Sequence, residues 1–233
     1  MLKTLIILSD GTEIFSGAST GNAVQSCTMT QTVNSEDNLT LGSVCAAMVE
    51  VTLITPEGGL HLAAGDSIQV YKVDDSGARH KVGIFIAEKP TRGSQNSYKV
   101  TAYDHVTKLD KDLTDWIMGL SGWPYKMRDF AEMVCEQCGL QLASISFPNG
   151  EYEIQQFLGN GITGRQLMSW VGQAAARYIS ANEDGDIVLD WYRQTDRSIT
   201  PSGDLFYYRG GLSYEDYDTY PIEKVQIDRK SVV

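Results

Sequence analysis

Polar and apolar residues alternate along much of residues 3–103, which is the pattern of strands that bury one face and expose the other. Residues 24–32, for example, are rich in threonine and alternate in this way. Turn-forming residues, such as those at 9–11, 74–77 and 90–94, separate the alternating segments. Short strands at this spacing predict a sandwich or a barrel. The predicted strands are residues 3–8, 12–15, 24–32, part of 39–54, 67–73, 80–87 and 97–103.

The hydrophobic period changes after Tyr103, where helical patterns begin. Asp104 is expected to cap a short helical stretch that ends at Leu109, and residues 116–125 are expected to form an irregular aromatic connection. A longer helix is predicted next, with Gly139 as its left-handed cap. Residues 140–147 and 151–157 are predicted as strands. The apolar stripe of the longer helix consists of Met127, Phe130, Ala131, Val134 and Cys138.

Residues 162–192 carry the strongest helix signal and the clearest hairpin signal. Thr163 and Gln166 have the spacing of a capping box, so the helix is expected to begin at Gly164. A strand, the turn 182–185 and a second strand at 186–192 should follow, so we expect a helix packed on a β-hairpin. The apolar stripe of this helix consists of Leu167, Val171, Ala174, Ala175 and Tyr178.

These patterns predict a mainly β chain with an α+β insertion. Residues 1–108 are expected to form the first part of a β-barrel, and residues 109–200 the insertion. Residues 201–233 would return to that barrel or begin a second, truncated one, with strands at 206–208 and 222–227.

Composition and charge narrow the class of protein. The 233 residues are 42% hydrophobic and 21% charged, as in globular proteins. The net charge of -11 repels phosphate backbones and anionic membranes, so stable nucleic-acid binding is not expected. No apolar run is long enough for membrane insertion, and the run at 1–8 is short for a signal peptide. The sequence therefore predicts a protein that is made in the cytoplasm, where its four cysteines are reduced.

Residues 159–164 spell GxGxxG before a helix, the fingerprint of a dinucleotide site. That site needs a buried parallel strand before the first glycine, and an acidic residue at the end of the next strand. Residues 151–157 alternate like a half-exposed antiparallel strand, and Asp184 and Asp186 lie in the turn before the last strand. We therefore predict a glycine loop that enters a capped helix, and no cofactor.

Cys135 and Cys138 form a lone CxxC in the last turn of a helix. A structural zinc site needs four ligands, and a thioredoxin-type site places its motif at the start of a helix, so a partly buried pair is the better interpretation. The three histidines have no matched nucleophile or carboxylate motif and are interpreted as structural. They are His61, His80 and His105.

Three other features of the sequence have the residue types of a binding or modification site. The oxygen-rich segment 182–186 lacks the spacing of a calcium loop and is interpreted as a hairpin turn. The sequon at 38–40 has no meaning without a secretory signal. The tryptophans could stack on sugars but more often serve as core or interface anchors. They are Trp116, Trp123, Trp170 and Trp191. The sequence thus predicts no catalytic, cofactor-binding or metal-binding residue.

Residues 82–90 (VGIFIAEKP) and 98–105 (YKVTAYDH), followed by Lys108-Leu109-Asp110, resemble the hub or tail-tip proteins of bacteriophage and prophage tails. The resemblance extends over most of the chain. It implies a β-barrel related to the tail-tube fold that is interrupted by an α+β insertion, to which residues 162–192 are similar. Hubs of this family usually carry a second complete barrel, whereas only residues 201–233 follow the insertion here. A fragment, a short variant and a monomer in isolation all stay open.

The resemblance implies a structural protein that is not an enzyme. It would assemble as a trimeric ring with paired barrels that imitate six-fold symmetry, and would join the tail tube to a spike or tip. Its partners would be copies of itself and the tail-tube, tape-measure and spike or tip proteins. It would occupy the host cytoplasm during assembly and the virion tail, or a tail-like particle, afterwards. Acidic walls suit a conduit, because they do not hold passing DNA by ion pairs.

Two other classes of function remain open. A tail-associated peptidoglycan hydrolase would need paired carboxylates, or a cysteine with a histidine, brought together from distant segments. A carbohydrate-binding module would use exposed tryptophans as its platform.

Overall fold

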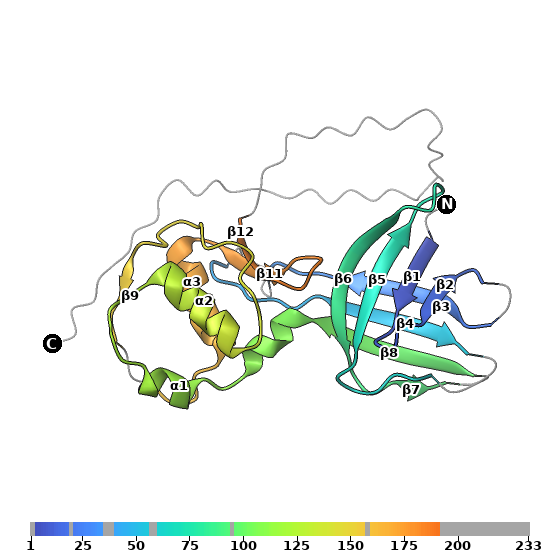
Figure 1. Cartoon of the computed structure of the whole chain (residues 1–233), viewed down its shortest axis with the longest axis horizontal. Coiled ribbons are helices and arrows are strands. Elements are labelled where there is room, and N and C mark those ends of the chain that lie inside the picture. Colours follow the sequence, from blue (N-terminus) through green and yellow to red (C-terminus); the bar gives the residue numbers. More distant parts are fainter. Residues whose placement is uncertain are drawn as a thin grey trace. The chain divides into compact units, whose positions relative to one another are not determined.

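The computed structural model describes residues 3–18, 21–34, 40–55, 60–93, 96–156 and 159–191. Its first part is a closed β-barrel, drawn in blue to green in Figure 1. Seven strands follow one another around the ring in the order β1, β5, β6, β8, β4, β3, β2, and the pairing of β4 with β8 closes it. The two-residue strand β7 (Thr91–Arg92) is added to β8. The ring strands are β1 (Lys3–Ile7), β2 (Glu13–Ser16), β3 (Ala23–Thr30), β4 (Met48–Ile54), β5 (Ser67–Val73), β6 (Arg79–Ala87) and β8 (Ser97–Asp104).

The alternation seen in the sequence fills the barrel. In β4, Val49, Val51 and Leu53 are almost fully buried, while Glu50 between them is exposed. Phe85 on β6 is 1% exposed, and burying a side chain of this size contributes about 1.5–3 kcal/mol. The inward residues of the seven strands therefore form one apolar core.

Strand pairing is antiparallel around the ring except between β2 and β3. Those two strands are parallel and pair only through Phe15 with Ala23 and Ser16 with Val24. A register shift follows at once in β3, between Val24 and Ser26. Beyond it β3 stays paired with β4 as far as Thr30, so β3 continues past the end of its contact with β2.

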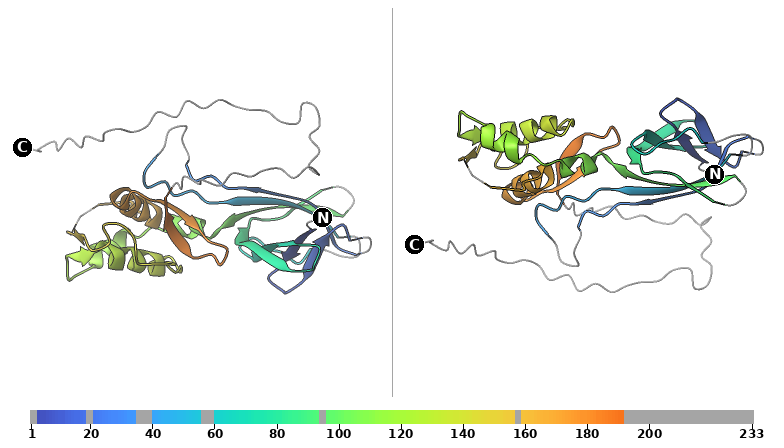
Figure 2. Two further views of the ribbon diagram at one scale, coloured as in Figure 1. Left: turned by 90° about the horizontal axis from the view of Figure 1, so that it is seen from above. Right: turned by 90° about the horizontal axis from the view of Figure 1, so that it is seen from below.

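The second part of the described chain is helical, with two small two-stranded sheets. It begins with the 3₁₀ helix η1 (His105–Asp110), and α2 and α3 pack against each other. Figure 2 shows the hairpin of β11 and β12, in orange, beside α3. Leu109, Phe130 and Leu167, each at most 2% exposed, lie in a second core that these elements share. The remaining elements are α1 (Thr114–Gly119), β9 (Tyr125–Lys126), α2 (Met127–Gln137), β10 (Glu153–Ile154), α3 (Gly164–Ala175), β11 (Tyr178–Ala181) and β12 (Ile187–Asp190).

A segment from the first part of the chain also contributes to the helical part. Before β4 begins, Gly42 donates its N–H to the carbonyl of Arg177, and Ile179 donates to the carbonyl of Ser43. Val44 forms a parallel bridge with Ile179. Gly42 has a positive φ of 74°, and a Cβ atom there would lie 2.3 Å from the carbonyl oxygen of Ser169. Only glycine allows this approach to α3.

The predicted mainly β fold with a barrel and an α+β part is confirmed, and so is helix α3 with its capping box. Three local predictions were wrong. Residues 140–147 are not a strand, because only Leu142 finds a bridge partner, Ile187. In the predicted strand 151–157 only Glu153–Ile154 pairs, with β9. The connection 116–125 begins inside helix α1. The strands predicted at 206–208 and 222–227 lie outside the described residues, so the predicted role of 201–233 stays a prediction.

Candidate interaction surfaces

The junction between barrel and helices is built on Asp104, the last residue of β8. Its side chain is 5% exposed and caps η1 by accepting the N–H of Val106 at 3.0 Å. The other carboxylate oxygen accepts the N–H of Ala47, just before β4, at 2.9 Å. Burial raises the pKa of Asp104, and the two N–H donors oppose that shift. One side chain thus ties the end of β8 to the start of β4.

The turn of the β11–β12 hairpin contacts the start of η1 and, at one point, the barrel. Nδ1 of His105 lies 3.0 Å from the carbonyl oxygen of Gly185, and Nζ of Lys81 on β6 lies 2.8 Å from Asp184. Burial lowers the pKa of His105, and the charges of Lys108 and Lys81 lower it further. The neutral imidazole can donate Nδ1–H to the carbonyl, so His105 has a structural role, as predicted.

Arg165 on α3 joins three segments of the chain. Nε lies 2.5 Å and Nη2 lies 3.1 Å from the two carboxylate oxygens of Asp110 in η1. Nη1 donates to the carbonyl of Val44, and Nη2 lies 3.5 Å from the carbonyl of Val106. A planar guanidinium suits this set of acceptors, because its donors diverge in a fixed fork.

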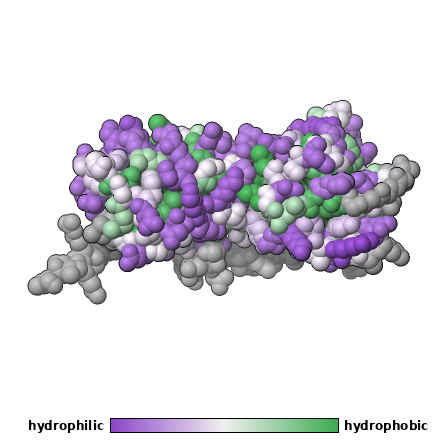
Figure 3. Space-filling view, turned by 60° about the horizontal axis from the view of Figure 1, so that its bottom comes forward, coloured by the Kyte–Doolittle hydropathy of each residue, from purple (hydrophilic) through white to green (hydrophobic). Residues whose placement is uncertain are grey.

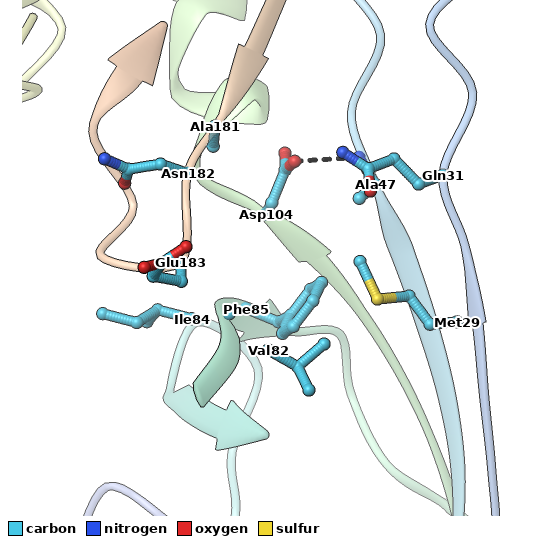
Figure 4. Close-up of a pocket in the computed structure, with 11 residues that line it drawn as sticks. Met29, Gln31, Ala47, Val82, Ile84, Phe85, Asp104, Ala181, Asn182 and Glu183 are labelled. Carbon is cyan, nitrogen blue, oxygen red and sulfur yellow. Dashed lines mark hydrogen bonds between the residues drawn. The ribbon is translucent and has the colours of Figure 1, made fainter. Parts of the chain in front are cut away.

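A polar cavity of about 180 Å³ lies between the barrel and the hairpin turn. Figure 4 shows Asp104 between the hairpin and Ala47, with its carboxylate directed at the Ala47 N–H. Glu183 also lines this space, so the cavity holds the two carboxylates that a hydrolase would need. The volume is well below the range of about 300–1,000 Å³ of ligand pockets, and both oxygens of Asp104 already accept backbone N–H groups. The arrangement is that of a junction between two parts of the fold.

The other two histidines lie apart from this junction. His80 is exposed, and its Nε2 lies 3.2 Å from Asp74. Hydrogen bonds from Ser76, His80 and Ala78 hold the pKa of Asp74 well below its usual range. His61 is exposed; hydrogen bonds from Thr12 lower the pKa of Asp10, and the charge of His61 makes a smaller contribution in the same direction.

The CxxC cysteines are both buried at the end of α2. Burial raises the pKa of Cys135 to about 12, so its thiol stays protonated and unreactive near neutral pH. The other two cysteines, Cys27 and Cys45, are half-buried. Across the described ranges, no three histidine, cysteine, aspartate or glutamate side chains are grouped so as to hold a metal ion.

The oxygen-rich segment 182–186 is a hairpin turn, as predicted. The side-chain oxygen of Asn182 accepts the N–H groups of Asp184 and Asp186, at 3.0 and 2.9 Å. The GxGxxG segment is a loop before a capped helix, also as predicted. The strand before it, Glu153–Ile154, pairs in the antiparallel sense with β9, so it is not the buried parallel strand that a dinucleotide site needs. The sequon at 38–40 lies mostly outside the described residues.

The four tryptophans divide between core and surface. Trp116 and Trp123 pack around Phe130, with ring centroids 6.2 and 5.9 Å from it. Trp170 is 47% exposed and borders an apolar groove of about 190 Å³ between α2 and α3. Trp191 is 36% exposed and lies under the guanidinium of Arg177. The groove is lined almost entirely by carbon, so it lacks the polar groups that orient a sugar.

The surface is mostly hydrophilic. Figure 3 shows hydrophilic residues over most of one face, with small hydrophobic areas between them. On the outer face of the barrel, Thr28, Glu50 and Thr101 lie side by side on β3, β4 and β8. This polar face is hollowed, with a volume of about 370 Å³. In the described part of the chain, no helix has the length and apolar character needed to cross a membrane.

No family model and no curated protein matches the sequence. Solved structures are similar to it. The 43 kDa tail protein of prophage MuSo2 from Shewanella oneidensis is 12% identical with a TM-score of 0.57, over 87% of this chain and 58% of that one. Prophage tail protein gp18 from Listeria monocytogenes EGD-e is 8% identical with a TM-score of 0.47, over 87% of this chain and 56% of that one. The chain therefore shares the fold of the MuSo2 tail protein and spans less than two thirds of its length.

Proposed function

We propose that this chain is a structural component of a phage or prophage tail, a hub or tail-tip protein that joins the tail tube to a spike or tip. The observation that carries the proposal is the likeness in fold to the MuSo2 tail protein, which takes in both the barrel and the helical part. At 12% identity the two sequences share few residues, so the support comes from the common arrangement of strands and helices.

The proposed partners are other proteins. The chain would form a trimer with copies of itself and would contact tail-tube, tape-measure and spike or tip proteins. It would be assembled in the bacterial cytoplasm and reside in the virion tail or in a tail-like particle. The net charge of -11 supports a wall that does not retain DNA, and we propose no membrane insertion.

The proposal assigns no catalysis. Of the two carboxylates of the junction cavity, Asp104 is occupied by two backbone N–H groups and Glu183 is exposed, and the cavity is too small for a sugar chain. Cys135 is protonated near neutral pH and buried in α2. A zymogram on bacterial cell walls should show no clearing at the position of the purified protein. A cleared band that disappears in Asp104→Asn or Glu183→Gln would replace this proposal with a peptidoglycan hydrolase.

Deletion of the coding sequence from its phage or prophage genome tests the proposed role. After induction, electron microscopy should find filled heads without tails or tails without a tip, and expression of the full chain in trans should restore complete particles. Intact, infectious particles in the deletion strain would overturn the proposal.

A further inference from the structure

One strand of the barrel has an edge without a partner strand in the described residues. β3 pairs with β4 from Ala23 to Thr30, but with β2 only through Ala23 and Val24. Residues 25–30 therefore present one side of their backbone to solvent, and five of these six residues are exposed. In a strand, alternate N–H and C=O groups point to this side, which makes a template for another strand.

The sequence of this edge does nothing to block pairing. Proteins protect open edges with lysine, proline or a bulge. Residues 25–30 (QSCTMT) contain no charge and no proline, and the register shift at Gln25 leaves residues 26–30 in regular pairing with β4. Thr28 and Thr30 favour extended backbone, and Met29 is 38% exposed. This edge is suited to receive a strand.

The same sheet has a second open edge. β7 pairs with β8 and with no other strand of the described chain, so β3, β4, β8 and β7 form four strands in a row. Each neighbouring pair in this row is antiparallel. β7 of a second copy, placed beside β3, continues the alternation of strand directions.

We propose that the β3 edge, residues 25–30, binds the β7 edge of a second copy of this chain. The two edges differ, so the contact is heterologous and repeats until a ring closes. β7 has only two residues, so one contact is weak and ring closure supplies most of the affinity. This inference rests on the proposed self-association and gives it a surface.

Proline substitutions in the full chain test the edge. Successive N–H groups of a strand point to opposite sides, so of Thr28→Pro and Met29→Pro one removes an outward donor and the other a bond to β4. The variant that keeps the wild-type circular dichroism spectrum and melting temperature is the one to compare. Sedimentation velocity should show its self-association weakened by at least about tenfold. Thr101→Lys is the matched control, because Thr101 lies in the same row as Thr28 but on an interior strand.

Mixing two variants tests the partner. Arg92→Pro or Thr91→Pro should disable the β7 edge and leave the β3 edge intact. Each variant alone should be monomeric at every concentration, whereas an equimolar mixture of a β3 and a β7 variant should form a one-to-one dimer at high protein concentration, where the one intact contact suffices without ring closure. Failure to form that dimer, with oligomers lost in the single variants, would contradict the pairing of β3 with β7.

Hydrogen exchange shows whether a second copy or the chain itself covers the β3 edge. In the wild-type protein, amides of residues 25–30 should exchange more slowly as concentration rises. Protection that is already present in a monomer at every concentration would mean that the chain covers its own edge, and would overturn the inference. Oligomers that persist in the folded proline variant, or that Thr101→Lys disrupts equally, would overturn it as well while leaving the proposed tail role standing.

Discussion

Nδ1 of His105 lies 3.0 Å from the carbonyl oxygen of Gly185, a residue 80 positions further along the chain. His105 follows the last barrel strand, and Gly185 is in the turn of the helical part's hairpin. The hydrogen bond therefore fixes the hairpin turn to η1, the element that directly follows the barrel. Its surroundings allow no side chain at residue 185, because a Cβ there would lie 2.2 Å from His105 Nδ1.

Gly185→Ala should destabilise the protein more than a left-handed backbone alone explains. Gly77 is the matched control, with a φ of 86° against 84° and open space around its Cβ position. Gly77→Ala should cost about 1 kcal/mol of unfolding free energy, and Gly185→Ala about 1–3 kcal/mol more. Urea denaturation gives both values. If the extra cost of Gly185→Ala does not shrink in a His105→Ala background, the contact is not its cause.

Arg165→Lys should lower the unfolding free energy by about 1–3 kcal/mol, because an ammonium group cannot reach Asp110 and the two carbonyls at once. Arg79→Lys offers a control, since Arg79 also forms a two-pronged pair with a carboxylate, Glu13, but on the exposed surface. That change should leave the melting temperature nearly unaltered. Equal losses in the two variants would remove the special role of Arg165.

Asp104 should give the protein a pH-dependent stability of unusual sign for an aspartate. Burial raises its pKa above the ordinary value of 3.8, so the folded protein holds a proton here more tightly than the unfolded chain. The contribution of this group is fully present below about pH 3.8 and is lost as the pH rises through the raised pKa. Asp104→Asn cannot titrate. The unfolding free energy of wild type minus that of the variant should therefore fall with pH, and a flat or rising difference would contradict the burial argument.

The cysteines should differ in reactivity. Cys135, with a pKa of about 12, should resist iodoacetamide in the native protein, whereas half-buried Cys45 should be labelled first. Mass spectrometry of peptides after timed labelling distinguishes the sites, and labelling in urea should reach all four thiols. Native labelling of Cys135 as fast as Cys45 would show that the end of α2 opens readily.

The sequence was most informative where local chemistry decides the structure. The alternation in residues 67–73 predicts β5 with the same bounds, and the capping box of Thr163 and Gln166 places the start of α3 at Gly164. In the same way, Asp104 was identified as a helix cap from its position before a helical pattern. Short-range hydrogen bonds and side-chain periodicity settle these elements without knowledge of distant partners.

Long-range pairing could not be predicted from the sequence. Nothing local indicates that β4 closes the ring on β8, or that Ser43 and Val44 run beside Ile179. The same limit explains the wrong strand at 140–147, whose alternation is real but serves to bury Leu140 and to pack Leu142 against the second core. A strand needs a partner, and local alternation does not say whether one is present.

The junction was also missed as a unit. The sequence identified Asp104 as a cap and His105 as a structural histidine, but it gave no role to Arg165. The partners of Arg165 are distant in the chain: Asp110 lies 55 positions away and Val44 lies 121 positions away. Arg165 binds backbone carbonyl groups, which every residue has, so its partners cannot be recognised from a sequence motif. Only the folded chain brings these groups together.

Immunogold electron microscopy of purified particles, with an antibody against this chain, tests the central claim most directly. The account predicts gold label at one end of the tail, at the junction of tube and tip, in particles from the wild-type genome and none in the deletion strain. Particles with complete tails that carry no label and no peptides of this chain would contradict it.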